Sequence, residues 1–286
     1  MFFEASPLFT ITVEGREFLV KRDDLYDPYL SGNKYRKLHT LLQSPSSQYT
    51  TIVSYGGTQS NAMLALAALC KQKKWQFIYY TKDVSSSQKQ QQVGNFYNAL
   101  ALGMEHRVLE NELYKEYILD LEIHLPSRTL LVHQGGADSM AKEGLAVLAK
   151  EIRENDGGVK SIATPSGTGT TALFLALALP EYKVYTTPCV GDTKYLLEQM
   201  SALCAIPQNL VILEPKKKYH FAKPYKEFYE MYHKTKEAGV VFDLLYAPAM
   251  WLSLLDLTKE KVLYVHSGGV SGNESMLLRY SQKFSL

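Results

Sequence analysis

Hydrophobic and polar positions alternate along the chain between short apolar runs and longer runs with helical spacing. The longer runs predict helices at Lys34–Leu42, from about residue 60 to Lys73, and at Asn95–Leu102, Asn111–His124, Ser139–Glu154 and Thr171–Ala178. The short runs predict strands at Phe18–Lys21, Thr51–Ser54, Gln76–Tyr80, His106–Leu109, Thr129–His133, Val159–Thr164 and Lys261–Val265. Strands that alternate with helices are typical of βαβ units, so we expect an α/β fold with parallel sheets covered by helices.

Glycine-rich polar turns follow four of the predicted strands. They are Gly56-Gly57, Gly135-Gly136, Ser166-Gly167-Thr168-Gly169 and Ser267-Gly268-Gly269. Ligands of open α/β sheets bind beyond the carboxyl ends of the strands, so we expect the chemistry of the protein at these turns. The polar run Ser85–Gln92 carries no such signal and is expected on the surface.

The turn from Ser166 to Thr171 has the composition of a phosphate-binding loop. Its two glycines allow backbone N–H groups to point inward, and the helix that follows adds partial positive charge. No Gly-Lys-Ser/Thr follows, so it is not a Walker A loop, and it lacks the third glycine of a dinucleotide fingerprint. By itself the turn fits phosphate binding and an ordinary connection equally well.

Lys34 stands at the start of a predicted helix, directly after Ser31-Gly32-Asn33. The positive end of the helix dipole disfavours a protonated lysine, and burial would lower its pKa further. A lysine of lowered pKa is what covalent chemistry with a carbonyl group requires, although a lysine here can equally be a solvated surface charge. The polar residues Gln59, Ser60 and Asn61 could cap the next helix or bind a ligand.

Composition narrows the possible classes of protein. With 286 residues, of which 46% are hydrophobic, the chain can bury a core without disulfides or metals. A net charge of +2 argues against a dedicated nucleic-acid binder. The three cysteines form no framework and the seven histidines have no metal-ligand spacing, so we expect no metal. We find no secretory leader and no membrane-length apolar run, and we expect a reduced, soluble, cytoplasmic protein.

Several segments together resemble the 1-aminocyclopropane-1-carboxylate (ACC) deaminase and D-cysteine desulfhydrase family over essentially the whole chain. They are Lys21-Arg22-Asp23-Asp24-Leu25, Gly32-Asn33-Lys34-Tyr35-Arg36-Lys37-Leu38, Gly56–Asn61, Gly135-Gly136-Ala137 with Gly144, Ser166–Thr171, Asp243–Tyr246 and His266–Gly269. The resemblance implies the tryptophan-synthase-β-like fold (fold type II), with two three-layer α/β domains and pyridoxal 5'-phosphate between them. Residues 45–134 would form the smaller domain and residues 1–44 with 135–286 the larger, cofactor-binding one. It also implies a homodimer that acts on a small amino acid.

The resemblance also implies roles for individual residues. Lys34 matches the lysine that binds the cofactor covalently and then moves a proton, and Tyr246 matches the tyrosine near the reacting carbon. Gln59 and Ser60 match the substrate-binding residues, Ser60 being also a candidate for acid–base catalysis. The remaining cofactor contacts would be Asn61 at the ring hydroxyl, Ser166, Gly167, Thr168, Gly169 and Thr170 at the phosphate, and Ser267 at the pyridine nitrogen. A neutral hydroxyl at that nitrogen weakens the electron sink and favours elimination at the β-carbon.

Two departures from the family pattern bear on the reaction. Ala247 stands where the deaminase has an acid, and Ala62-Met63-Leu64 is apolar where a polar residue and an arginine are expected. Both disfavour opening of a cyclopropane ring and favour β-elimination from a small amino acid such as D-cysteine. ACC deamination, or racemisation or synthesis by the same fold, is the alternative. A degenerate binding protein that uses the basic, aromatic segment Lys216–Lys226 is the non-enzymatic alternative.

Overall fold

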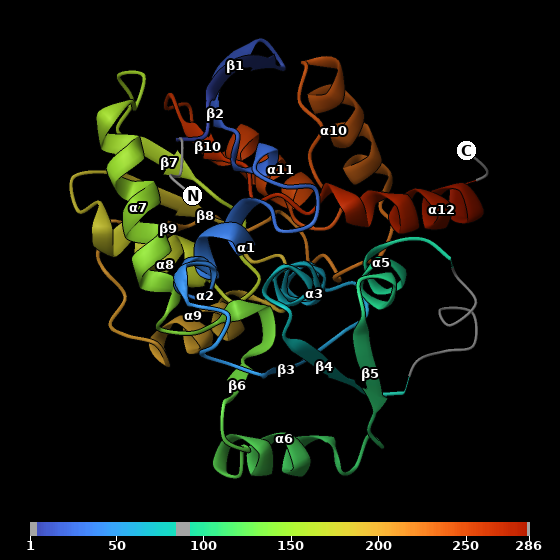
Figure 1. The fold of residues 1–286 in the computed structure, drawn as a ribbon. Coiled ribbons are helices and arrows are strands. Elements are labelled where there is room, and N and C mark those ends of the chain that lie inside the picture. The colour runs from blue at the N-terminus through green and yellow to red at the C-terminus, as the bar shows by residue number, and fades with distance from the viewer. Residues whose placement is uncertain (1–4, 84–91, 285–286) are drawn as a thin grey trace.

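The computed structural model describes residues 5–83 and 92–284, and the polar run Ser85–Gln92 lies outside them except for Gln92. These residues form two separate β-sheets, of six and four strands, with helices on both faces of each (Figure 1). The predicted α/β class, with fold type II architecture, is confirmed. In the described ranges no helix is both long and apolar enough to cross a membrane.

The larger sheet has the strand order β1-β2-β10-β7-β8-β9. Only the β1–β2 pair is antiparallel, and every other neighbouring pair is parallel. The strands are β1 (Leu8–Val13), β2 (Arg16–Lys21), β7 (Ser161–Ala163), β8 (Lys183–Thr186), β9 (Leu210–Ile212) and β10 (Leu263–Val265).

Successive residues of the larger sheet pack into different hydrophobic clusters. Ile162 belongs to the cluster formed with α7 (Ala141–Glu154), α8 (Thr170–Ala178) and α9 (Thr193–Ser201). The next residue, Ala163, belongs to the cluster formed with α10 (Lys226–Glu237) and α11 (Ala247–Leu257). Because side chains alternate between the faces of a strand, these clusters are the two faces of one sheet, which gives a three-layer arrangement.

The smaller sheet is entirely parallel, with the strand order β5-β4-β3-β6. Its strands are β3 (Thr51–Tyr55), β4 (Gln76–Thr81), β5 (Met104–Val108) and β6 (Thr129–Val132). One face packs against α3 (Asn61–Lys73) and α5 (Asn95–Ala101), and the other against α6 (Tyr114–Ile123) at the lower edge of Figure 1. The domain boundaries at residues 45 and 134 stay a prediction, although the small sheet falls within them.

The structure divides one predicted helix and contains several elements that the pattern did not predict. The helix expected over Lys34–Leu42 is divided into α1 (Gly32–Lys37) and α2 (His39–Gln43), because the backbone of Leu38 leaves the helical region at ψ 13°. The additional elements are the strands β1, β8 and β9, the helices α9, α10, α11 and α12 (Asn273–Phe284), and the short 3-10 turns Asp23–Leu25, Gln134–Gly136 and Val270–Gly272. All four predicted glycine turns do follow strands, at the carboxyl ends of β3, β6, β7 and β10.

A buried ionic cluster holds α1 against the larger sheet. The Arg36 guanidinium donates to both oxygens of Asp23, at 2.8 and 2.9 Å, and to both oxygens of Glu151, at 2.6 and 2.8 Å. Lys21 Nζ, on β2, lies 2.8 Å from Glu151 Oε2. The cluster therefore joins α1 to α7 and β2, and it fixes the helix that carries Lys34.

Candidate active site

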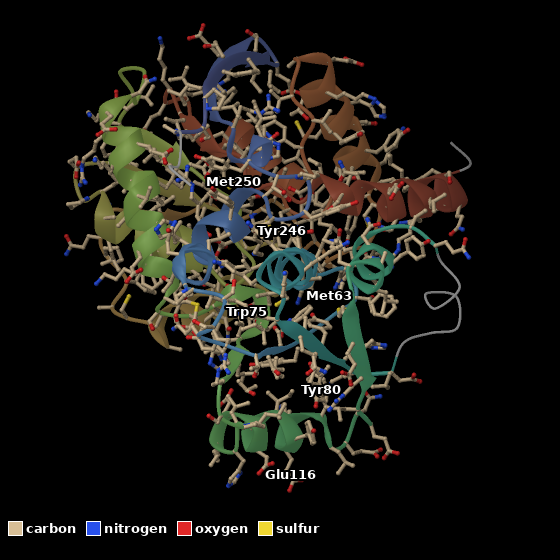
Figure 2. All side chains as sticks on the ribbon, viewed as in Figure 1. Met63, Trp75, Tyr80, Glu116, Tyr246 and Met250 are labelled. Carbon is tan, nitrogen blue, oxygen red and sulfur yellow. The ribbon has the colours of Figure 1, made fainter. Side chains whose placement is uncertain are left out.

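One cavity of about 370 Å³ brings together every residue for which the sequence predicted a cofactor, catalytic or substrate role. The α3 turn contributes Gln59, Ser60 and Asn61, and the larger sheet contributes the turn from Ser166 to Thr170. Lys34, Tyr246 and Ser267 complete the predicted set. In the view of Figure 2, Tyr246 lies between Met250, on α11, and Met63, on α3. Because the lining turns follow β3 of the smaller sheet and β7 of the larger one, both sheets contribute to the cavity.

Lys34 lies in the first turns of α1, where the backbone is in close contact with the turn that follows β10. A Cβ on Gly32, whose φ is +57°, would lie 2.1 Å from the carbonyl carbon of Ser267. Only glycine therefore allows the Ser267 turn to approach the start of α1 this closely. Asn33 N also donates to Ser267 O at 3.2 Å. The contact fixes Lys34 and Ser267 on adjoining walls of the cavity.

The Lys34 amine has an unusually low affinity for a proton. Burial lowers its pKa from 10.5 to about 8, and the buried carboxylate of Asp243 opposes this shift. A fraction of the amine is therefore unprotonated near neutral pH, as attack on an aldehyde requires. The condition that the sequence left open, a desolvated lysine at a helix start, is met in this fold.

The turn between β7 and α8 presents hydrogen-bond donors to the cavity. Gly169, with φ +78°, precedes α8, and no side chain caps the first turn of that helix. Thr168 Oγ1 and Thr170 Oγ1 are 3.0 Å apart, and both residues line the cavity. Uncapped N–H groups at a helix start, together with hydroxyl donors, suit a phosphate dianion.

Lys37 is a second lysine of the cavity, and sequence reasoning assigned it no role. It is buried, and its Nζ donates to Gly135 O at 3.1 Å. Burial, and after it the charge of Lys34, hold the pKa of Lys37 well below its ordinary value. Its spacing of three residues from Lys34 puts both on one face of α1, which was the available signal.

Tyr246 immediately precedes α11 and lines the cavity. Its backbone N donates to Asp243 Oδ1 at 2.6 Å, so the carboxylate holds the turn that presents the ring. Burial raises the pKa of the Tyr246 hydroxyl, and the neighbouring Asp243 raises it further. The tyrosine therefore keeps its proton and can donate a hydrogen bond to a ligand.

Ser60 is the N-cap of α3, and its Oγ accepts a hydrogen bond from Met63 N at 3.2 Å. Capping and ligand binding were alternatives in the sequence, and the structure combines a capping bond with a position in the cavity wall. Asn61 Oδ1 accepts from Asn95 Nδ2 at 2.7 Å, and Gln59 Oε1 accepts from Ser275 Oγ at 2.9 Å. Asn95 and Ser275 had no signal in the sequence, because they approach the site only through tertiary packing.

The residues of the cavity fit pyridoxal 5'-phosphate. The turn from Ser166 to Thr170 with Lys37 would suit the phosphate of this cofactor, and Lys34 would suit its aldehyde. The Asn61 amide and the Ser267 hydroxyl would suit the ring hydroxyl and the ring nitrogen. By contrast, the described ranges contain no group of three or more His, Cys, Asp and Glu residues arranged to hold a metal ion.

Comparison with known proteins agrees with the geometry. A protein of Pyrococcus furiosus provisionally named 1-aminocyclopropane-1-carboxylate deaminase is 28% identical, over 90% of this chain and 86% of its own. The bifunctional D-cysteine desulfhydrase/1-aminocyclopropane-1-carboxylate deaminase of Arabidopsis thaliana is 24% identical, over 90% of this chain and 73% of its own. The predicted resemblance to the ACC deaminase and D-cysteine desulfhydrase family is confirmed. No protein-family model matches the chain.

The solved structure of an ACC deaminase homologue superposes with a TM-score of 0.76 at 22% identity, covering 96% of this chain and 94% of that one. This superposition supports the predicted fold.

Proposed function

We propose that the protein is a pyridoxal-phosphate-dependent lyase that acts on a small amino acid and releases a 2-keto acid and ammonia by β-elimination. The observation that carries the proposal is the shared cavity: a lysine of lowered pKa meets there the glycine- and hydroxyl-rich turn from Ser166 to Thr170, at which the uncapped helix α8 begins. A small homodimer in the cytoplasm is the setting we expect for it.

The residues of this chain divide the work of binding. Lys34 Nζ would hold the aldehyde carbon of the cofactor, and the turn from Ser166 to Thr170 would hold its phosphate together with Lys37. Asn61 would donate to the ring hydroxyl, and Ser267 would face the ring nitrogen. When bound, the cofactor supplies a sink for the electrons of a broken bond at the substrate's α-carbon. The first N–H groups of α3, beside Gln59 and Ser60, would bind the substrate carboxylate.

Lys34 and Tyr246 would act on the reacting atoms. With its amine free, Lys34 Nζ would take the proton from the α-carbon, which its lowered pKa permits. The bond from the β-carbon to the leaving group would then break, and the leaving group would depart with the electron pair. Tyr246, which keeps its own proton, would donate a hydrogen bond to the negative charge that grows on that group. The enamine formed by elimination would take up water and yield the keto acid and ammonia.

A screen of D- and L-amino acids for keto-acid release, with sulfide measured in parallel, tests the proposal. We expect turnover of a β-substituted alanine such as D-cysteine by the cofactor-loaded protein and none by Lys34→Ala. Inversion of configuration without keto-acid release would indicate a racemase instead. Failure to bind the cofactor would support a binding protein, although Lys216 of the basic segment is already paired with Asp256, at 2.7 Å.

A further inference from the structure

Arg279 is a cation of the cavity wall to which the proposed function gives no task. It lies on α12 and lines the same cavity as Lys34 and Tyr246. Its Nη1 donates to Ala222 O at 3.1 Å, and no carboxylate of the described residues pairs with it. A guanidinium group has five N–H donors in a planar fork, so most of them remain for a ligand.

Three cationic side chains line the cavity, and the proposed function assigns a task to only two of them. Lys34, Lys37 and Arg279 line it, and among its described lining residues there is no aspartate or glutamate. The proposed function assigns Lys34 to the cofactor's aldehyde. It assigns Lys37 to the phosphate, because Lys37 donates to Gly135 O and Gly135 adjoins Thr168 of the turn. The start of α3 serves the α-carboxylate. Arg279 is then the cationic lining residue of the described chain without an assigned partner, and its guanidinium is available to a second anionic group of the substrate.

The neighbours of Arg279 place it beside the substrate. Ser275, one turn earlier on α12, donates to the side chain of Gln59 at 2.9 Å, and residues four apart share a helix face. Arg279 itself holds the carbonyl of Ala222, whose neighbour Phe221 lies 5.3 Å, ring centre to ring centre, from Tyr246. Gln59 and Tyr246 are predicted to contact the substrate, and Arg279 is linked to the first through α12 and to the second through the segment Phe221-Ala222.

We infer that the preferred substrate is a short amino acid whose side chain carries an oxyanion, and that Arg279 binds this group. The inference rests on the proposed lyase function. The side chain must be short, because a cavity of about 370 Å³ has to hold both cofactor and substrate. During elimination the bond from the β-carbon to the substituent breaks and the substituent keeps the electron pair. Its negative charge therefore grows next to a fixed guanidinium, which stabilises the departing group.

The test compares the binding of an acidic amino acid with that of its neutral isostere. Calorimetry with the cofactor-loaded protein measures the dissociation constants of D- and L-aspartate and of D- and L-asparagine, none of which carries a β-substituent that leaves readily. We expect one enantiomer of aspartate to bind about tenfold or more tightly than the matching asparagine. In Arg279→Gln this ratio should fall to about one, while asparagine binds as before.

A matched control removes one positive charge close to Ala222, the residue that Arg279 contacts. Lys223 is exposed, lies one residue after Ala222 and does not line the cavity, so Lys223→Gln should keep the preference for aspartate. A wild-type ratio near one overturns the inference, as does a ratio that survives Arg279→Gln. Equal weakening of aspartate and asparagine by Arg279→Gln also overturns it, because Arg279 would then bind the α-carboxylate or only brace Ala222.

Failure of the inference and failure of the proposed function are distinguishable. Cofactor uptake is measured first, by the visible absorbance of the reconstituted protein. A protein that takes up no cofactor overturns the proposed function and the inference with it. A protein that takes up cofactor and eliminates from neutral β-substituted alanines, but shows no preference for aspartate, keeps the function and loses the inference.

Discussion

Asn95 Nδ2 donates to Asn61 Oδ1 at 2.7 Å, and this bond fixes which end of the Asn61 amide faces the ligand. With its oxygen engaged, Asn61 offers its N–H₂ group as the remaining donor to the cavity. Asn95 is itself held, because its Oδ1 accepts from Ser271 Oγ at 2.9 Å. A buried residue of α5 thus orients a residue at the start of α3 for the proposed contact with the cofactor's ring hydroxyl.

Asn95→Ala should weaken cofactor binding by about five- to tenfold, the worth of one well-placed hydrogen bond. The reason is that the Asn61 amide loses its fixed orientation. Fluorescence titration of the cofactor-free protein measures the change. Asn98 lies on the same helix and does not line the cavity, so Asn98→Ala is the control. It should bind the cofactor as tightly as the wild type does. Equal affinities of Asn95→Ala and the wild type would show that Asn61 needs no such support.

The rate at which the cofactor-free protein captures pyridoxal phosphate should rise with pH and level off above about pH 8. Only the unprotonated Lys34 amine attacks an aldehyde, and burial lowers its pKa to about 8, so below that value the rate should rise about tenfold per pH unit. Stopped-flow absorbance follows the reaction.

Asp243→Asn provides the check on this pH dependence. The Asp243 carboxylate raises the pKa of Lys34, so its removal should move the midpoint of the profile to lower pH. A midpoint near 10.5, as for a solvated lysine, would be incompatible with the buried position described for Lys34.

Gly169→Ala should destabilise the protein by about 2–4 kcal/mol and weaken phosphate binding. The backbone there has φ +78°, and a Cβ would lie 2.4 Å from Met200 Cγ. Gly158→Ala separates backbone strain from the clash with Met200. Gly158 has φ +80°, so it has the strain, but an added Cβ would meet no atom within 4 Å. It should cost about 1 kcal/mol in urea denaturation. Similar losses for both variants would mean that Met200 moves aside freely.

Arg36→Met should destabilise the protein by about 3–5 kcal/mol, because it leaves the carboxylates of Asp23 and Glu151 buried with less compensation. Arg153→Met removes an ion pair with Glu181 that is nearly half exposed, and should cost less than about 1 kcal/mol. Urea denaturation compares the two. If Arg36→Met were as mild as Arg153→Met, the ionic cluster would not be what holds α1 in place.

The strand–turn–helix units could be predicted because their signals are local. One example is contiguous in sequence: the run Thr51–Ser54, then the turn Gly56-Gly57, then an apolar helix. The structure contains this strand as β3 and this helix as α3. The strand Leu8–Val13 was missed because it is an edge strand with several exposed positions, so its apolar pattern is incomplete. The interruption at Leu38 is a change in one residue's backbone angles that composition does not encode.

The residues of the site also fall into those with a local signal in the sequence and those without one. The predicted residues lie in turns or at the helix starts beside them, where glycines and polar side chains are visible in the sequence, and they share one cavity. Asn95 and Arg279 have no such signal. Asn95 reaches Asn61 across 34 residues, and Arg279 reaches Ala222 across 57, so only the folded chain brings them to the site.

The central claim is that the Lys34 side chain binds the aldehyde of pyridoxal phosphate. Borohydride reduction of the loaded protein converts a carbon–nitrogen double bond between them into a stable amine, and peptide mass spectrometry then locates the modified residue. We predict modification at Lys34 alone, and none there in Lys34→Ala. Modification at the neighbouring Lys37, or a loaded protein with no modified lysine, would contradict the claim.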